Sequence, residues 1–130
     1  MTQEEQQRSE VANYWWEKAE SSILSAQREL DAGAYIYSIN RLYYALFYAV
    51  SAVLLKKGIT FKKHSGVRAA FHRNIVKPGL MKTKWGKLYD QLFEDRHEGD
   101  YIALIEFNKS YVESRLKECK AFLSELEKIS

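Results

Sequence analysis

The segment from Tyr35 to Lys57 constrains the fold most, because its apolar residues cover nearly the whole circumference of a helix. These apolar positions are Ile36, Ile39, Leu42, Tyr43, Leu46, Phe47, Val50, Val53 and Leu54. A helix that is apolar all round is buried at the centre of a larger structure. Its longest uncharged run, Leu42 to Leu55, has fourteen residues, whereas a membrane span needs about 20. The pattern therefore predicts the central helix of a bundle, with no membrane.

Apolar residues at three- and four-residue steps predict four further helices, at about residues 4–31, 65–77, 81–96 and 101–128. We expect Gly33, Gly58 and Gly99 to follow the first, second and fourth helices, since a residue without Cβ suits a helix C-terminus. Ser65 and Asp100 are the expected N-caps of the third and fifth helices. In the last segment Ile105, Val112, Cys119 and Leu126 recur every seven residues, which is a bundle-type stripe.

The composition agrees with an all-α fold. The 130 residues include one proline and six glycines, and no strand pattern competes with the helices. We predict a single domain, residues 1–130, that forms an up-and-down four-helix bundle with one extra short helix. The single cysteine, Cys119, excludes an intrachain disulfide and suits a reducing compartment. The polar N-terminus has no apolar signal-like stretch, so we expect a cytoplasmic protein.

Charge is segregated along the chain. Between Asp31 and Asp90 there is no acidic residue and eleven basic ones, whereas the rest of the chain carries seventeen acidic and nine basic residues. The basic positions are Arg41, Lys56, Lys57, Lys62, Lys63, Arg68, Arg73, Lys77, Lys82, Lys84 and Lys87. Such a segment either binds an external anion or acidic partner, or lies against the acidic terminal helices of the same molecule.

Arg41 is the least expected residue of the apolar segment. Its helical neighbours at three and four residues are Tyr37, Ser38, Tyr44 and Ala45, none of them acidic. A guanidinium that is even partly buried must be paired. We therefore expect a remote partner for Arg41, either a bound anion or a structural acid such as Asp95 or Asp100.

Arg96 is the second candidate, because an arginine, a histidine, carboxylates and a tyrosine gather between Glu94 and Tyr101. These groups can support acid–base chemistry and stabilise phosphate charge, although a cation at a helix C-terminus also complements the helix dipole. We expect Arg96 and Arg41 to share one cleft. The spacing of His64, His72 and His97 fits no metal site, and we expect no metal or other cofactor.

Three stretches together resemble the HEPN family (higher eukaryotes and prokaryotes nucleotide-binding domain). Residues 38–47, SINRLYYALF, resemble the family's Ser-x-x-Arg-x-Tyr-Tyr-Ala-x-Phe core. Residues 63–67, KHSGV, resemble the Thr/Lys-His-x-Gly segment that follows it, and Arg96 to Tyr101 is similar to the Arg-x-x-x-Asp-Tyr corner. The resemblance implies a helical bundle, commonly homodimeric, and often paired with a minimal nucleotidyltransferase that acts as antitoxin.

The resemblance also implies site residues. Nuclease members carry an arginine followed a few residues later by a histidine; here Arg96 takes the arginine position and Tyr101 stands where the histidine is expected. We predict a nucleotide- or RNA-binding protein of the toxin type that partners a nucleotidyltransferase. Phosphate or nucleotide would be bound by Arg41, Tyr44, Lys63, His64, Asp100 and Arg96, with Tyr101 and the loop lysines Lys62, Lys82 and Lys84 assisting.

Two alternatives stay open. In a metal-independent ribonuclease, Arg96 would hold the scissile phosphate while His97 or Tyr101 moved the proton. In a protein-interaction module, the basic segment would dock an acidic partner.

Overall fold

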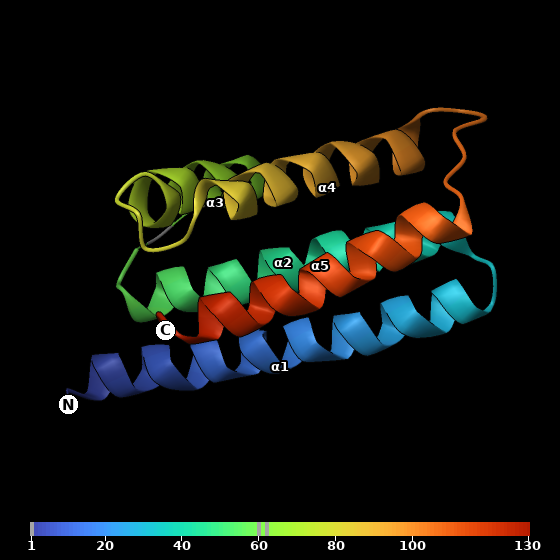
Figure 1. Ribbon diagram of the computed structural model, residues 1–130. Coiled ribbons are helices and arrows are strands. Elements are labelled where there is room, and N and C mark those ends of the chain that lie inside the picture. The colour runs from blue at the N-terminus through green and yellow to red at the C-terminus, as the bar shows by residue number, and fades with distance from the viewer. Residues whose placement is uncertain (1, 60, 62) are drawn as a thin grey trace.

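The computed structural model describes residues 2–59, 61 and 63–130, and the regular elements of this described part are all helices, with no strand. The elements are α1 (Gln3–Asp31), α2 (Tyr35–Lys56), α3 (His64–Phe71), the π-helical turn η1 (His72–Val76), α4 (Thr83–Tyr101) and α5 (Lys109–Glu127). The long helices run up and down the molecule, with the short α3 beside α4 (Figure 1). This confirms the predicted four-helix bundle with a short extra helix.

Helix α2 is the central element, as its all-round apolar pattern predicts. It packs against α1, α3, α4 and α5, and Ile39, Leu42, Tyr43, Leu46 and Val50 are fully buried. By length and composition α2 could cross a membrane, but 72% of the relevant 18-residue stretch is buried inside the bundle. Its apolar surface is therefore covered by the neighbouring helices, as in a core helix.

One helix end differs from prediction at the junction after α2, the start of α3. Gly33 and Gly58 adopt φ of 76° directly after the last turns of α1 and α2, as expected. However, Lys63 rather than Ser65 occupies the N-cap position of α3, because its extended backbone precedes the first helical residue, His64. Ser65 lies inside the first turn.

The junction between α4 and α5 was predicted wrongly. Helix α4 continues through Gly99 and Asp100 to Tyr101, and α5 begins at Lys109 with Asn108 as its N-cap. The Asn108 Oδ1 accepts a hydrogen bond from the Tyr111 N–H at 2.8 Å. Gly99 does not end the helix but allows close packing, since an added Cβ would lie 3.3 Å from Ile36 Cγ2. Ile105 consequently lies in the connecting loop rather than in the α5 stripe.

Candidate functional site

The Arg96 guanidinium lies on a floor of aromatic rings. Its central carbon is 4.6 Å from the ring centroid of Tyr43, 5.7 Å from that of Phe93 and 6.0 Å from that of Tyr44. The arginine side chain is 11% exposed. Helix α2 thus supplies the Tyr43 and Tyr44 rings, while α4 supplies Phe93 and the cation itself. This cation–π arrangement orients the planar group without neutralising it.

The hydrogen-bonding capacity of Arg96 is largely unused within the described part of the chain. Its Nη1 is 3.9 Å from Asp100 Oδ2, which is too long for a hydrogen bond, and its buried Nε has no partner there. The Asn40 amide donates to both Asp100 oxygens, at 3.2 and 3.4 Å. A nearly buried guanidinium with open donors provides a charge-assisted binding point for an anion.

His64 completes the site from the start of α3. Its Nδ1 is 3.2 Å from the Tyr43 hydroxyl, and its ring stacks on Phe47 at 4.3 Å and packs edge-on against Tyr44 at 5.6 Å. Burial, and then the positive charge of Arg96, lower the pKa of His64 below its ordinary 6.5. The imidazole is therefore neutral at neutral pH. We refer to Arg96, Tyr43, Tyr44, His64, Asn40 and Asp100 as the Arg96 site.

Arg68 lies beside this site but is already paired. Its guanidinium carbon is 4.4 Å from the Phe93 ring centroid, its Nε donates to Asp90 Oδ1 at 2.8 Å, and its Nη1 is 3.7 Å from Glu94. Among the described residues, Arg68 is the one member of the acid-free basic segment that forms an ion pair. The basic segment is thus not neutralised by acids of α1 or α5, which leaves its charge available to an external anion.

Four of the predicted residues, Arg96, Asp100, Tyr44 and His64, come together from three helices. His97 and Tyr101 do not join them. Their rings are 5.0 Å apart and Tyr101 is 69% exposed. Each successive residue turns about 100° around a helix, so His97 leaves α4 on a different side from Arg96.

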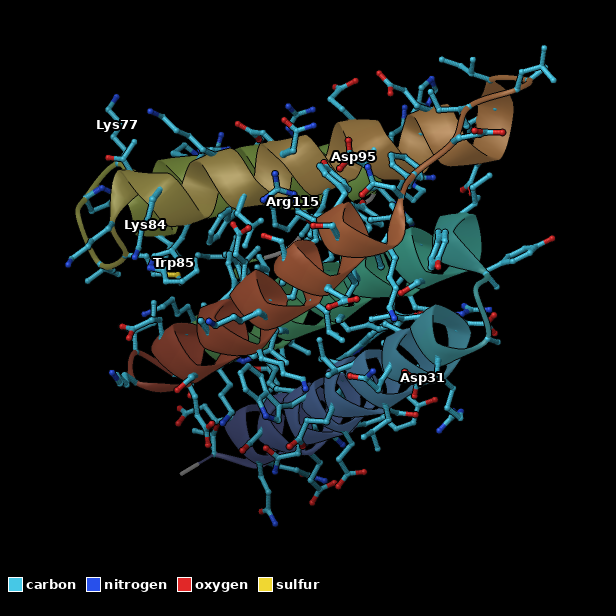
Figure 2. All side chains as sticks on the ribbon, turned by 45° about the vertical axis from the view of Figure 1, so that its right-hand side comes forward. Asp31, Lys77, Lys84, Trp85, Asp95 and Arg115 are labelled. Atoms are coloured by element: carbon cyan, nitrogen blue, oxygen red, sulfur yellow. The ribbon has the colours of Figure 1, made fainter. Side chains whose placement is uncertain are left out.

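The remaining predicted lysines lie around the site or beyond it. Lys63 is exposed at the start of α3, and Lys82 and Lys84 are exposed near the start of α4. Figure 2 shows Lys84 and Lys77 together at the far end of α4 from its junction with α5. Lys62 lies outside the described residues.

The expectation that Arg41 is at least partly buried was wrong, and the structural acids offered as its partner do not pair with it. Arg41 is exposed and lines a groove between α1 and α2 with Lys18, Arg28 and Tyr48. Neither proposed acid pairs with it, since Asp95 accepts from Gln91 and Tyr111, and Asp100 accepts from Asn40. The apolar pattern of α2 leaves one polar sector uncovered, and Arg41 occupies it.

Sequence reasoning missed Asn40, Tyr43 and Phe93 as site residues. Asn40, Tyr43 and Phe47 stand three and seven residues apart, which places them along one face of α2. That spacing could have identified the face of α2 that lies against α4. The contribution of Phe93 had no comparable signal, because an aromatic residue on the apolar side of a helix is ordinary core.

Comparison with known proteins gives the family. The family model described as HEPN domain matches residues 12–129 of this chain. A UPF0332 protein of Thermotoga maritima is 41% identical over 123 residues, covering 95% of this chain and 93% of the relative. The chain therefore belongs to the HEPN domain family.

Two further relatives carry a functional name. "Putative toxin MJ0142" of Methanocaldococcus jannaschii is 33% identical over 86% of this chain and 76% of that protein. "Putative toxin MJ0605" of the same organism is 28% identical over 86% of this chain and 83% of that protein. The similarity to both extends across most of the bundle.

Proposed function

We propose that this protein binds RNA or nucleotide phosphates through the Arg96 site, as the toxin-type component of a pair with a minimal nucleotidyltransferase. The observation that carries the proposal is the Arg96 guanidinium, 11% exposed and 3.9 Å from its nearest acid, with an unpartnered Nε among the described residues. Burying a charged group without a close partner is costly. A bound phosphate would offset that cost.

The other residues of the site have complementary roles in this proposal. Tyr44 offers a ring for base stacking, and Asp100, held by Asn40 at 3.2 Å, can accept a hydrogen bond from a ribose hydroxyl. Lys63 and the neutral His64 stand at the start of α3, where Lys63 adds positive charge. Arg41 binds phosphate from the neighbouring groove.

Fluorescence anisotropy with labelled single-stranded RNA and with ATP, in EDTA and over a range of salt, tests this proposal. Arg96→Ala should weaken RNA binding at least about tenfold and lower the salt dependence by roughly 0.7 per lost phosphate contact. Arg115→Ala is the matched control, since Arg115 also stacks on a tyrosine but is paired with Glu118 at 2.5 Å. RNA affinity that changes neither with salt concentration nor in the Arg96→Ala variant would refute the proposal.

A second candidate function is metal-independent RNA cleavage, favoured by the neutral His64 beside Arg96. His64 could take the proton of a ribose 2′-hydroxyl as its oxygen attacks the adjacent phosphorus and forms a cyclic phosphate. The P–O5′ bond breaks, the 5′-oxygen takes a proton from water, and Arg96 stabilises the phosphate charge. Cleavage in EDTA should then be lost in His64→Gln and retained in the matched variant His97→Gln. Loss of cleavage in His97→Gln but not in His64→Gln would return the proton transfer to the His97 and Tyr101 side of α4. Absence of cleavage by the wild-type protein would exclude this activity.

Exposed apolar side chains at the start of α2 and at the end of α4 support the proposed homodimer and the nucleotidyltransferase complex. Tyr37, Tyr101, Ile102 and Leu104 are 66%, 69%, 50% and 99% exposed, and large exposed apolar side chains are typical of protein-interaction surfaces. Leu104→Asp should weaken self-association in sedimentation analysis, or capture of a co-expressed nucleotidyltransferase. If only acidic proteins are captured and no RNA binds, the basic segment is a protein-docking surface instead.

A further inference from the structure

The groove between α1 and α2 is a second cluster of unpaired cations. It is lined by Lys18, Ser21, Ser22, Ser25, Arg28, Arg41 and Tyr48, and no acidic side chain lines it. None of its three cations forms an ion pair with a described residue. Three like charges around one groove repel each other, so an anion bound between them would be stabilised.

The α1 side of the groove is built by helix periodicity. Ser21, Ser22, Ser25 and Arg28 follow Lys18 by three, four, seven and ten residues, which places all five on one stripe of α1. The ten steps from Lys18 to Arg28 span about 15 Å of helix axis. That length suits a chain of several phosphates better than a single phosphate group, with the serine hydroxyls available as donors to phosphate oxygens.

A row of aromatic rings joins this groove to the Arg96 site. Ring centroids are 5.4 Å apart for Trp15 and Tyr48, 5.8 Å for Tyr48 and Tyr44, and 5.1 Å for Tyr44 and Tyr43. Lys18 Nζ lies 5.1 Å from the Tyr48 ring centroid at one end. The Arg96 guanidinium lies over Tyr43 at the other end. Cations thus flank a continuous aromatic strip, the combination that single-stranded nucleic acids use for binding.

We propose that the groove of Lys18, Arg28 and Arg41 is a second phosphate-binding site that extends the path of a single-stranded RNA from the Arg96 site across Tyr44 and Tyr48. This inference rests on the proposed RNA binding at Arg96. It assigns Arg41 to the backbone of a neighbouring nucleotide rather than to the phosphate held by Arg96. An oligonucleotide that reaches both places makes more phosphate contacts than one that fills the Arg96 site alone.

Two lengths of probe separate the two sites. We suggest labelled 2′-O-methyl oligouridine of roughly 4 and roughly 12 nucleotides, lengths that bracket single-strand site sizes, since this chemistry prevents cleavage. The groove variant is Arg28→Glu combined with Arg41→Glu. The matched control is Arg73→Glu combined with Lys77→Glu, which changes the charge equally at two exposed positions outside the groove.

The longer probe should bind the groove variant at least about tenfold more weakly, with the salt slope lowered by roughly 1.4 for two lost contacts. The control variant should lose less than about a third of that affinity change, compared as logarithms of Kd. The shorter probe should bind the groove variant and the control variant with affinities within about twofold of wild type. Ser25→Asp, which adds one negative charge to the groove, should weaken the longer probe in the same direction. Thermal unfolding of each variant verifies that it is folded. If the groove variant is not folded, Ser25→Asp is used in its place.

The possible failures are distinguishable. If Arg96→Ala weakens both probes but the groove variants leave the longer probe unchanged, the groove proposal is wrong and the proposed function stands. Equal losses in the groove and control variants would mean that overall charge, not the groove, attracts RNA. If wild type binds neither probe, the proposed function fails and the groove proposal fails with it.

Discussion

Two arginines of this bundle have nearly the same aromatic setting and different electrostatic surroundings. The guanidinium carbons of Arg96 and Arg115 each lie 4.6 Å from a tyrosine ring centroid, that of Tyr43 and that of Tyr111 respectively. Neither Nε has a partner among the described residues. Yet Arg115 Nη1 is 2.5 Å from Glu118, whereas Arg96 Nη1 is 3.9 Å from Asp100. Stacking on a tyrosine therefore does not distinguish the two arginines, whereas the distance to the nearest acid does.

The surroundings of Arg115 form a closed polar network, which we call the Arg115 corner: Arg115, Glu118, Tyr111, Asp95 and Gln91. Asp95 is 4% exposed and accepts hydrogen bonds from the Gln91 amide and the Tyr111 hydroxyl. Figure 2 shows Asp95 and Arg115 close together where α4 faces α5. Burial, and then the hydrogen bond to Asp95, raise the pKa of Tyr111. The corner joins two helices, whereas the Arg96 site leaves donors open.

The largest expected effect is on stability at the Arg115 corner. Asp95→Ala should lower the free energy of unfolding by about 2–3 kcal/mol, because it leaves the Gln91 and Tyr111 donors without their buried acceptor. Asp100→Ala should cost under about 1 kcal/mol, because the Asp100 side chain is 28% exposed and solvent can replace it. Urea unfolding of both variants measures the difference. Equal losses would remove the distinction between the two regions.

The next effect is on binding. Arg96→Lys keeps the charge but loses the planar fork stacked on Tyr43, so RNA affinity should fall by about 1–2 kcal/mol. Arg115→Lys should leave RNA affinity unchanged, since its guanidinium is already occupied by Glu118. Anisotropy titration at fixed salt compares the two. A full retention of affinity in Arg96→Lys would show that only charge matters at this position.

Removal of one tyrosine hydroxyl from the Arg115 corner and one from the Arg96 site should give a smaller difference in stability. Tyr111→Phe should destabilise the protein by about 1–1.5 kcal/mol, because the buried Asp95 carboxylate loses a donor. Tyr43→Phe removes a 3.2 Å contact to His64 and should cost about 0.5 kcal/mol. Thermal unfolding of both variants at one pH is sufficient. A larger loss in Tyr43→Phe would make the Arg96 site a structural network as well.

The smallest effect concerns pH. The pKa of His64 is lowered in the folded protein, so the unfolded chain binds a proton at higher pH than the folded protein does. Stability should therefore fall as pH decreases from about 6.5 towards the lower folded pKa. His64→Gln should flatten this part of the curve of unfolding free energy against pH, whereas His97→Gln should not. An unchanged curve in His64→Gln would show that Arg96 and burial do not perturb this histidine.

The sequence predicted the helices more reliably than their junctions. The α2 pattern and the glycines after α1 and α2 were interpreted correctly, because burial on all sides and positive φ each demand particular residue types. At the start of α5, Asp100 and Asn108 are both capable N-caps. The packing of Gly99 against Ile36 and Phe107 keeps α4 helical past Asp100, and that contact between distant segments leaves no local signal.

The site was predictable only in part for the same reason. Arg96, Asp100, Tyr44 and His64 were named from their chemistry and from a family resemblance, but their meeting depends on how α3 and α4 dock on α2. Arg41 was assigned to a buried setting from its apolar neighbours, yet a single sector of α2 remains uncovered and holds it.

The amino-acid sequence determined which segments are helical, which helix is central and where positive charge is concentrated, because these properties depend on residue type and on spacing along one helix. Tertiary structure decided which cations remain unpaired. Arg68 on α3 pairs with Asp90 on α4 at 2.8 Å, a contact that only the packing of the two helices creates. The acids nearest Arg96 and Arg115 lie one turn along the same helix, at 3.9 and 2.5 Å. Spacing in the sequence allows both of these pairs but does not fix their distance or burial, on which Coulombic attraction and desolvation depend.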